Sequence, residues 1–357
     1  MQKTDLWEQL KNETRPIVLY GTGNAAERIN AFLKEKGIKI SGVFASDSFV
    51  RNKVFDGLPV TSLSETEKQF GDFVILLCFG THLPEVISNI NAISKKHELF
   101  APDIPVVGEG LFDLEHYMEK EKEINALKNI LADDLSRQTL DAAVSYKLSG
   151  KLKYLYECEA GEDDVWRLAS KNKNDLTKNL LDLGAYTGDT AEEFARVNPE
   201  YKSIIAVEPE SRNFRKLCEY AGDNEKITCL NFGIGDKEEI IEFSKGSGRG
   251  SLSKKTVPTK FTTIDKLLFE NPNHSAEYNH SLLVKMDLEG NEAKAIEGGK
   301  NFIEKFHPNL LIAAYHRLDD LTEIPKQILT LHPGYKVYLR HSPCIPAWEF
   351  NYIFISE

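Results

Sequence analysis

A glycine-rich loop flanked by carboxylates is the first feature of the chain that could do chemistry. It reads Leu181-Asp182-Leu183-Gly184-Ala185-Tyr186-Thr187-Gly188-Asp189-Thr190 and links an apolar run to a helical pattern. Glycines let a ligand approach the backbone closely, and a helix N-terminus attracts anions. Asp189 would repel a pyrophosphate seated there, so NAD fits poorly. A cofactor with a cationic, phosphate-free centre, such as S-adenosylmethionine, fits better.

An acid at the end of the next apolar run complements this loop. Glu208, in Ala206-Val207-Glu208-Pro209-Glu210, can accept hydrogen bonds from both hydroxyls of a ribose through its two oxygens. Asn231 and Gly233 follow the third run and are expected to flank an adenine. The predicted cofactor contacts are Asp182, Gly184, Ala185, Tyr186, Thr187, Gly188, Asp189, Thr190, Glu208, Pro209, Asn231, Gly233 and Asp287.

Candidate catalytic groups stand at the ends of two later apolar runs. Asp287 and Glu289 follow Leu282–Met286, and His316 follows 309–314. A carboxylate at the tip of a buried strand has a raised pKa, and a histidine titrates near 6.5, so Asp287, His316 and Glu289 are candidate general bases. Glu289 could instead order the turn that follows it, or cap the helix that starts near Asn291.

Acceptor contacts are predicted at the same strand ends. Tyr315 and Arg317 accompany His316, while Arg340 and His341 end another run and could bind an anionic acceptor or be ordinary solvated residues. The stretch Gly246-Ser247-Gly248-Arg249-Gly250-Ser251 is a flexible loop by composition, and either a mobile lid or a plain surface loop fits it.

A second glycine loop lies near the N-terminus. Gly21-x-Gly23-x-x-Ala26 follows the apolar run Pro16–Tyr20 and fits the dinucleotide fingerprint, and Asp47 could meet a ribose hydroxyl. Many doubly wound domains keep such a turn only for packing, so both interpretations stay open.

The elements that must position these residues alternate between strand and helix patterns. In residues 1–112, strands are predicted at 16–20, 39–44 and 73–79, with helices at 25–36 and 84–97. Residues 113–164 show helical spacing and form a predicted connector. Residues 165–357 again alternate between strand and helix patterns, and they end in a predicted antiparallel pair of strands. We therefore expect an α/β protein with two doubly wound domains, an N-terminal Rossmann-like domain (1–112) and a C-terminal sheet domain (165–357), joined by a helical connector (113–164).

Composition excludes several function classes. The 357 residues are 41% hydrophobic and 28% charged, with a net charge of −11, which disfavours broad nucleic-acid binding. No apolar run is long enough to cross a membrane and the first residues do not form a secretory signal, so a cytoplasmic location is expected. The five cysteines contain no C-x-x-C pair and the nine histidines no ligand spacing, so no metal is expected.

The segments LLDLGAYTGDT, AVEPE, TTIDKL, VKMDLEGNEAKAIEGG and AAYHRLDDL occur in the order found in the FkbM family of class I methyltransferases, which this chain resembles over residues 165–345. Asp287-Leu288-Glu289-Gly290-x-Glu292 is similar to the family signature, and Ala132–Arg137 resembles a stretch that precedes the catalytic core. The resemblance implies a seven-stranded sheet, S-adenosylmethionine as methyl donor and an O-methylated product such as a sugar. Family members often carry an acid where this chain has Ala313-Ala314-Tyr315-His316, at the expected acceptor site.

The leading prediction is an S-adenosylmethionine-dependent methyltransferase that methylates a hydroxyl of a sugar, a glycan or a related small molecule. One alternative is an NAD-dependent oxidoreductase that uses the loop at Gly21. The other is a binding protein that senses a nucleotide-sugar and has an inactive methyltransferase domain. The sequence leaves the acceptor and the oligomeric state open.

Overall fold

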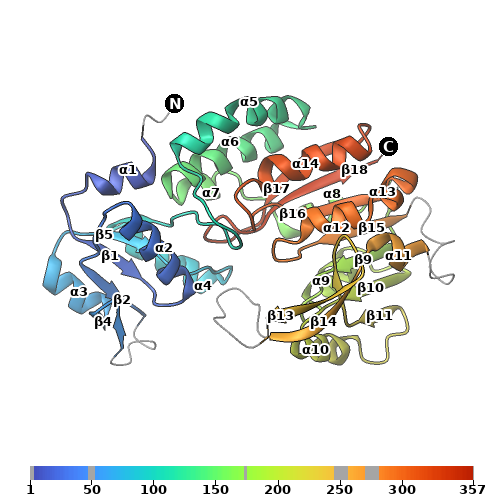
Figure 1. Ribbon diagram of the computed structural model, residues 1–357, viewed down its shortest axis with the longest axis horizontal. Helices are drawn as coiled ribbons and strands as arrows, with labels where there is room; N and C mark the ends of the chain where they lie inside the picture. Colours follow the sequence, from blue (N-terminus) through green and yellow to red (C-terminus); the bar gives the residue numbers. More distant parts are fainter. Residues whose placement is uncertain (1–3, 47–52, 173–174, 245–255, 270–280, 357) are drawn as a thin grey trace.

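The computed structural model describes residues 4–46, 53–172, 175–244, 256–269 and 281–356. Two sheets, each with its own helices, lie at opposite ends of the molecule, and helices α5–α7 run above and between them (Figure 1). Asp47 and the stretch Gly246–Ser251, which by its sequence fits both a lid and a surface loop, lie outside the described residues.

The first sheet has six strands in the order β3-β4-β2-β1-β5-β6, all parallel except for the β3–β4 pair. Every residue of the central strands β1 and β5 is buried, as expected for a parallel sheet covered on both sides. The elements are α1 (Leu6–Lys11), β1 (Ile17–Tyr20), α2 (Asn24–Glu35), β2 (Gly42–Phe44), β3 (Val54–Phe55), β4 (Leu58–Thr61), α3 (Leu63–Phe70), β5 (Val74–Leu77), α4 (Pro84–Ser94) and β6 (Glu98–Phe100).

The connector is a helical layer. It contains α5 (Leu114–Ile130), α6 (Asp134–Ser149), α7 (Lys153–Tyr156) and α8 (Glu162–Ala169), so the predicted boundary at residue 164 falls inside a helix. The chain between α5 and α6 adds to the edge of the second sheet, where the N–H of Ala132 donates to the carbonyl of Val337 at 2.8 Å. Leu127, Leu140 and Val337 belong to one apolar core that also contains residues of both large sheets.

The second large sheet has seven strands in the order β11-β10-β9-β15-β16-β18-β17, with only β18 antiparallel to its neighbours. The predicted α/β class and the predicted seven-stranded sheet are therefore confirmed. Its strands are β9 (Asn179–Leu183), β10 (Ser203–Val207), β11 (Ile227–Leu230), β15 (Leu282–Met286), β16 (Asn309–Ala313), β17 (Lys336–His341) and β18 (Phe350–Ile355). Its helices are α9 (Asp189–Val197), α10 (Ser211–Ala221), α11 (Ile264–Phe269), α12 (Glu292–Gly298), α13 (Lys300–Phe306) and α14 (Asp320–Leu331).

Smaller elements complete the fold. A pair β7 (Lys171–Asn172) and β8 (Asp175–Leu176) precedes β9, and a three-stranded sheet joins β12 (Gly233–Ile234), β14 (Thr256–Thr262) and β13 (Glu239–Ser244). The single helix predicted from Asn291 is two helices, because Gly298 packs directly on the backbone of the loop after β12. A Cβ at Gly298 would lie 2.1 Å from the carbonyl oxygen of Gly235.

The N-terminal sheet contacts the second sheet near the carboxyl ends of its strands. Beyond β5, the backbone of Thr81 exchanges hydrogen bonds with Ile345 of the β17–β18 loop, and the ring of Trp348 lies on Gly80. Further along, the N–H of Val107 donates to the carbonyl of His316 at 2.9 Å. Residues of the first domain therefore form part of the wall around the predicted catalytic groups.

Among the described residues, no helix has the length and apolar character needed to cross a membrane.

Candidate functional site

The glycine loop and the end of β15 meet at the point where strand order reverses in the second sheet. Open α/β sheets bind ligands at this point. Gly184 has a φ of +90°, and a Cβ there would lie 1.9 Å from the carbonyl oxygen of Asp287. Only glycine therefore allows the loop after β9 to lie against the backbone of the Asp287 turn.

Glu208 is fixed beside this loop by two backbone groups. Its Oε2 accepts from the N–H of Tyr186 at 3.0 Å, and its Oε1 accepts from the N–H of Glu210 at 2.8 Å. Asn231 holds the same turn, because its amide donates to the carbonyl of Glu208 at 2.8 Å. Burial raises the pKa of Glu208 to about 7, although the backbone hydrogen bonds act in the opposite direction.

Asp182 is fully buried beneath the loop and faces a lysine that sequence reasoning did not single out. Lys285 is its register partner on β15, with Nζ 3.6 Å from Asp182 Oδ1 and 3.9 Å from Asp287 Oδ2. Burial raises the pKa of Asp182 to about 7, with Lys285 opposing it. Burial would lower the pKa of Lys285, but the two carboxylates raise it above its ordinary value. Lys285 therefore offsets part of the negative charge predicted here.

The three predicted catalytic residues lie together. His316 Nε2 is 3.4 Å from Asp287 Oδ1 and 3.7 Å from Glu289 Oε2. The hydroxyl of Tyr315 contacts both oxygens of Asp287, at 3.2 and 3.3 Å. The ends of β15 and β16 thus bring together residues that are 28 positions apart in the chain.

Glu292, which was not among the predicted site residues, completes this group. Its Oε1 lies 2.9 Å from His316 Nδ1 and accepts hydrogen bonds from the N–H groups of Leu288 and Gly290. Glu292 therefore orders the turn, which is one of the roles predicted above for Glu289. Burial alone would lower the pKa of His316, but Glu292, Asp287 and Glu289 raise it to about 9. At neutral pH the histidine holds a proton, which makes it a poorer base than its neighbours.

Arg317 follows β16 and hydrogen-bonds to the turn after β15. Its Nε donates to the carbonyl of Gly290 at 2.6 Å, and its backbone N–H donates to Asp320 at 2.7 Å. Val107 packs against Gly290, since a Cβ there would lie 3.2 Å from the Val107 side chain.

The structure does not bring Arg340 and His341 into this group. The guanidinium of Arg340 is paired with Asp133 of the connector, at 2.5 and 3.2 Å, and also donates to Ser136 at 2.7 Å. His341 is buried against the ring of Phe350, and burial lowers its pKa to about 4. In the structure Arg340 joins the connector to the sheet and His341 is a core residue, so neither side chain is placed to contact an acceptor beside Asp287.

The other predicted cofactor contacts lie in or near the loop. Ala185 and Thr190 are buried, Gly188 is the N-cap of α9, and Tyr186 is 50% exposed. Thr187 and Pro209 are partly buried. Gly233 packs under the ring of Phe261, where a Cβ would lie 2.4 Å from a ring carbon.

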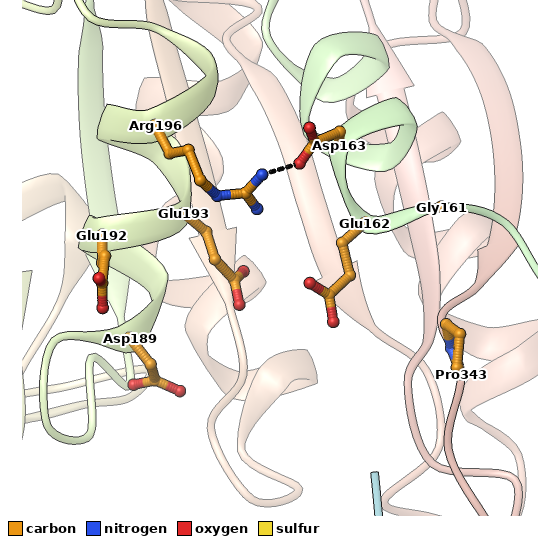
Figure 2. A pocket seen from close by; sticks show the side chains of 8 residues that line it. All are labelled: Gly161, Glu162, Asp163, Asp189, Glu192, Glu193, Arg196 and Pro343. Carbon is orange, nitrogen blue, oxygen red and sulfur yellow. Dashed lines mark hydrogen bonds and ion pairs between the residues drawn. The ribbon is translucent and has the colours of Figure 1, made fainter. Parts of the chain in front are cut away.

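An acidic pocket of about 670 Å³ borders the loop at Asp189 (Figure 2). Helices α8 and α9 supply most of its walls, and Asp163 is paired with Arg196 across it. Burial raises the pKa of Glu193, which accepts a hydrogen bond from Trp166 at 2.7 Å. The lining residues are Gly161, Glu162, Asp163, Asp189, Glu192, Glu193, Arg196 and Pro343. This surface suits a cationic group and disfavours a phosphate.

A family model for the methyltransferase FkbM domain matches residues 182–337, which include the glycine loop and the Asp287–His316 group. The chain carries an FkbM methyltransferase domain. The resemblance seen in the sequence is thereby confirmed over these residues, and the match supports a methyltransferase function.

One solved structure shows the same fold along nearly the whole chain. The chain is similar to a crystal structure of a methyltransferase FkbM from Methylobacillus flagellatus KT, with 20% identity, a TM-score of 0.69, and coverage of 98% of this chain and 92% of that one. A precorrin-6y C5,15-methyltransferase from Geobacter metallireducens is 12% identical over 55% of this chain and 87% of its own, with a TM-score of 0.34. No curated protein sequence gives a significant match.

Proposed function

We propose that the chain transfers a methyl group from S-adenosylmethionine to a hydroxyl of a sugar, a glycan or a related acceptor. The observation that carries the proposal is the fixed carboxylate of Glu208 beside the glycine loop. Each of its oxygens accepts one backbone N–H and has a further lone pair, so two adjacent ribose hydroxyls could donate to them. The acids around the loop favour a sulfonium or ammonium group over a pyrophosphate.

The proposed donor site consists of the loop 184–190, Glu208 and Pro209 at its rim, and Asn231 and Gly233 toward the base of the nucleoside. Asp182 supplies negative charge below the loop and Asp287 supplies it beside the loop. The positive charge of Lys285 offsets part of this negative charge. The donor supplies a methyl carbon already activated by its positive sulfur. The protein then has to orient the acceptor, exclude water and accept a proton.

Asp287 and Glu289 are the proposed proton acceptors. Both face His316, whose raised pKa keeps it protonated and makes it a partner for their charge. A positioned base contributes about 10² to 10⁴ in rate. Tyr315 and Arg317, at the same edge, are the proposed acceptor contacts. Carboxylates here accept hydrogen bonds from hydroxyls and repel phosphates, which favours a neutral polyol at the reacting end.

The domain of residues 1–112 is proposed to close over the acceptor. Val107 reaches the backbone of His316, and Trp348 fixes the facing loop against Gly80. An acceptor bound between the two sheets would be shielded from water, as methyl transfer requires.

A methyl-transfer assay tests this function. Formation of S-adenosylhomocysteine is followed with a panel of sugars and glycans, using the wild type, Asp287→Ala and His316→Ala. Glu323→Gln, which removes an exposed carboxylate of α14, is the control. We expect transfer to at least one hydroxyl acceptor, with losses of about 10² or more in Asp287→Ala. Rates near the wild type in both site variants would reject the assignment.

A ligand panel separates the alternative functions. Thermal unfolding is measured with S-adenosylmethionine, S-adenosylhomocysteine, NAD, NADP and nucleotide-sugars, because a ligand of the folded state raises the unfolding temperature. Stabilisation by NAD alone would favour the oxidoreductase.

A further inference from the structure

The group around His316 has the composition of a metal site. One ligand atom from each of Asp287, Glu292 and His316 lies within 4.8 Å of the other two. The 3.4 Å between His316 Nε2 and Asp287 Oδ1 is long for a hydrogen bond, for which about 2.7–3.2 Å is usual. It matches two ligands of one ion, because ligands at about 2.1 Å from an ion lie about 3.0–3.4 Å apart.

Two polar atoms of the group are buried without a hydrogen-bond partner among the described residues. His316 is 0% exposed and Glu292 is 1% exposed. Within the described part of the chain, neither His316 Nε2 nor Glu292 Oε2 makes a hydrogen bond. An unsatisfied buried polar group destabilises the fold, so native proteins rarely leave one without a compensating group. A cation bound at Nε2 would supply that group.

We infer that Asp287 and His316 Nε2 bind a divalent cation, with Glu292 as a positioning residue. Glu292 Oε1, 2.9 Å from Nδ1, would accept the Nδ1 proton, which fixes the neutral tautomer and turns the Nε2 lone pair toward Asp287. One carboxylate and one imidazole leave most positions of a Mn²⁺ or Mg²⁺ ion free for water or a substrate oxygen. The ion would take the position of a proton at Nε2, so metal binding and protonation at this nitrogen exclude each other.

The place of the ion in the reaction rests on the proposed function, whereas its binding does not. The site lies at the acceptor edge, where a cation would bind a hydroxyl oxygen and lower the pKa of that hydroxyl. The hydroxyl proton passes to Glu289, the oxygen forms a bond to the methyl carbon, and the methyl–sulfur bond breaks with its electron pair going to sulfur.

The test measures Mn²⁺ binding by the full chain without any methyl donor. Protein treated with EDTA and freed of chelator is titrated with MnCl₂, and free Mn²⁺ is read from its electron paramagnetic resonance signal. We expect one Mn²⁺ per chain, competed by Mg²⁺, and nitrogen modulation from one histidine in the pulsed spectrum. Because the pulsed spectrum uses the wild type, the result does not depend on whether a variant folds.

Variants locate the ion. Asp287→Asn and His316→Gln are each expected to weaken Mn²⁺ binding at least tenfold. In His316→Gln the nitrogen modulation should also disappear. Glu292→Gln should weaken it by about 10- to 100-fold while the modulation remains. Glu323→Gln should bind as the wild type does. Absence of bound Mn²⁺, or bound Mn²⁺ without nitrogen modulation, would overturn the inference. If the wild type binds Mn²⁺ as expected but does not bind S-adenosylmethionine, the proposed function is overturned and the inferred metal site stands.

Discussion

Replacement of Glu208 by glutamine tests the proposed ribose contact. The change keeps the size of the side chain, removes its charge and leaves one oxygen to serve the N–H groups of Tyr186 and Glu210. Hydrogen bonds to a charged group contribute about 1.5–3 kcal/mol each. Loss of one such bond predicts a fall in S-adenosylmethionine affinity of about 10- to 100-fold, since about 1.4 kcal/mol corresponds to a factor of ten.

The pH dependence sharpens this prediction. The pKa of Glu208 in the folded chain is about 7, above the ordinary value of 4.5. Between pH 4.5 and about 7, Glu208 of the folded, ligand-free protein therefore holds a proton that the same residue in the unfolded chain has released. This stabilising contribution is present below pH 4.5 and is lost as the pH rises to 7, by up to about 3 kcal/mol. Ribose hydroxyls prefer the ionised carboxylate, so affinity should rise with pH up to about 7 and then level off.

Equilibrium dialysis of labelled S-adenosylmethionine between pH 5.5 and 8.5 measures both effects. The wild type should gain affinity with rising pH, and the difference between it and Glu208→Gln isolates the part due to this carboxyl. Glu219→Gln, on the exposed side of α10, is the matched control and should follow the wild type. Equal affinities in Glu208→Gln and the wild type across this range would refute the reasoning.

Two further substitutions probe the frame of the site. Gly184→Ala should lower the free energy of unfolding by about 3 kcal/mol or more in urea titrations, because its Cβ would meet the carbonyl of Asp287. Gly37→Ala, also at positive φ but in open space, should cost only about 1 kcal/mol, and similar costs for both would contradict the packing argument. Arg340→Met should cost about 1–2 kcal/mol, because it removes the cation paired with the partly exposed Asp133. Burial raises the pKa of Asp133, but Arg340 and Ser136 hold it at about 2, below its usual 3.8. The wild type should lose stability as the pH falls from 3.8 to 2, and an equal acid loss in Arg340→Met would argue against the pair.

Much of the fold follows from local patterns. From their apolar periods, the sequence predicts a helix at 189–197, a strand at 203–207 and a helix at 211–221. The elements α9, β10 and α10 have these bounds in the structure. The strands β12, β13 and β14 were not predicted. Two-residue strands such as β12 carry no period, and β13 places the 75% exposed Ile240 away from any core.

The sequence could predict those site residues that directly follow neighbouring strands. Asp287, Glu289 and His316 meet because β15 and β16 are neighbours, which an α/β pattern implies. The ion-pair partners of Lys285 and Arg340 could not be predicted in this way. Lys285 matters only through the register that places it beside Asp182, and Arg340 pairs with a residue 207 positions away. Such pairings depend on tertiary packing, so a charged residue inside a strand gives no local sign of them.

Calorimetric titration of the purified, full-length chain examines the central claim most directly. The account predicts saturable uptake of S-adenosylmethionine and S-adenosylhomocysteine at one site per chain, with no heat from NAD at the same concentrations. Heat from NAD together with none from either sulfur compound would contradict it.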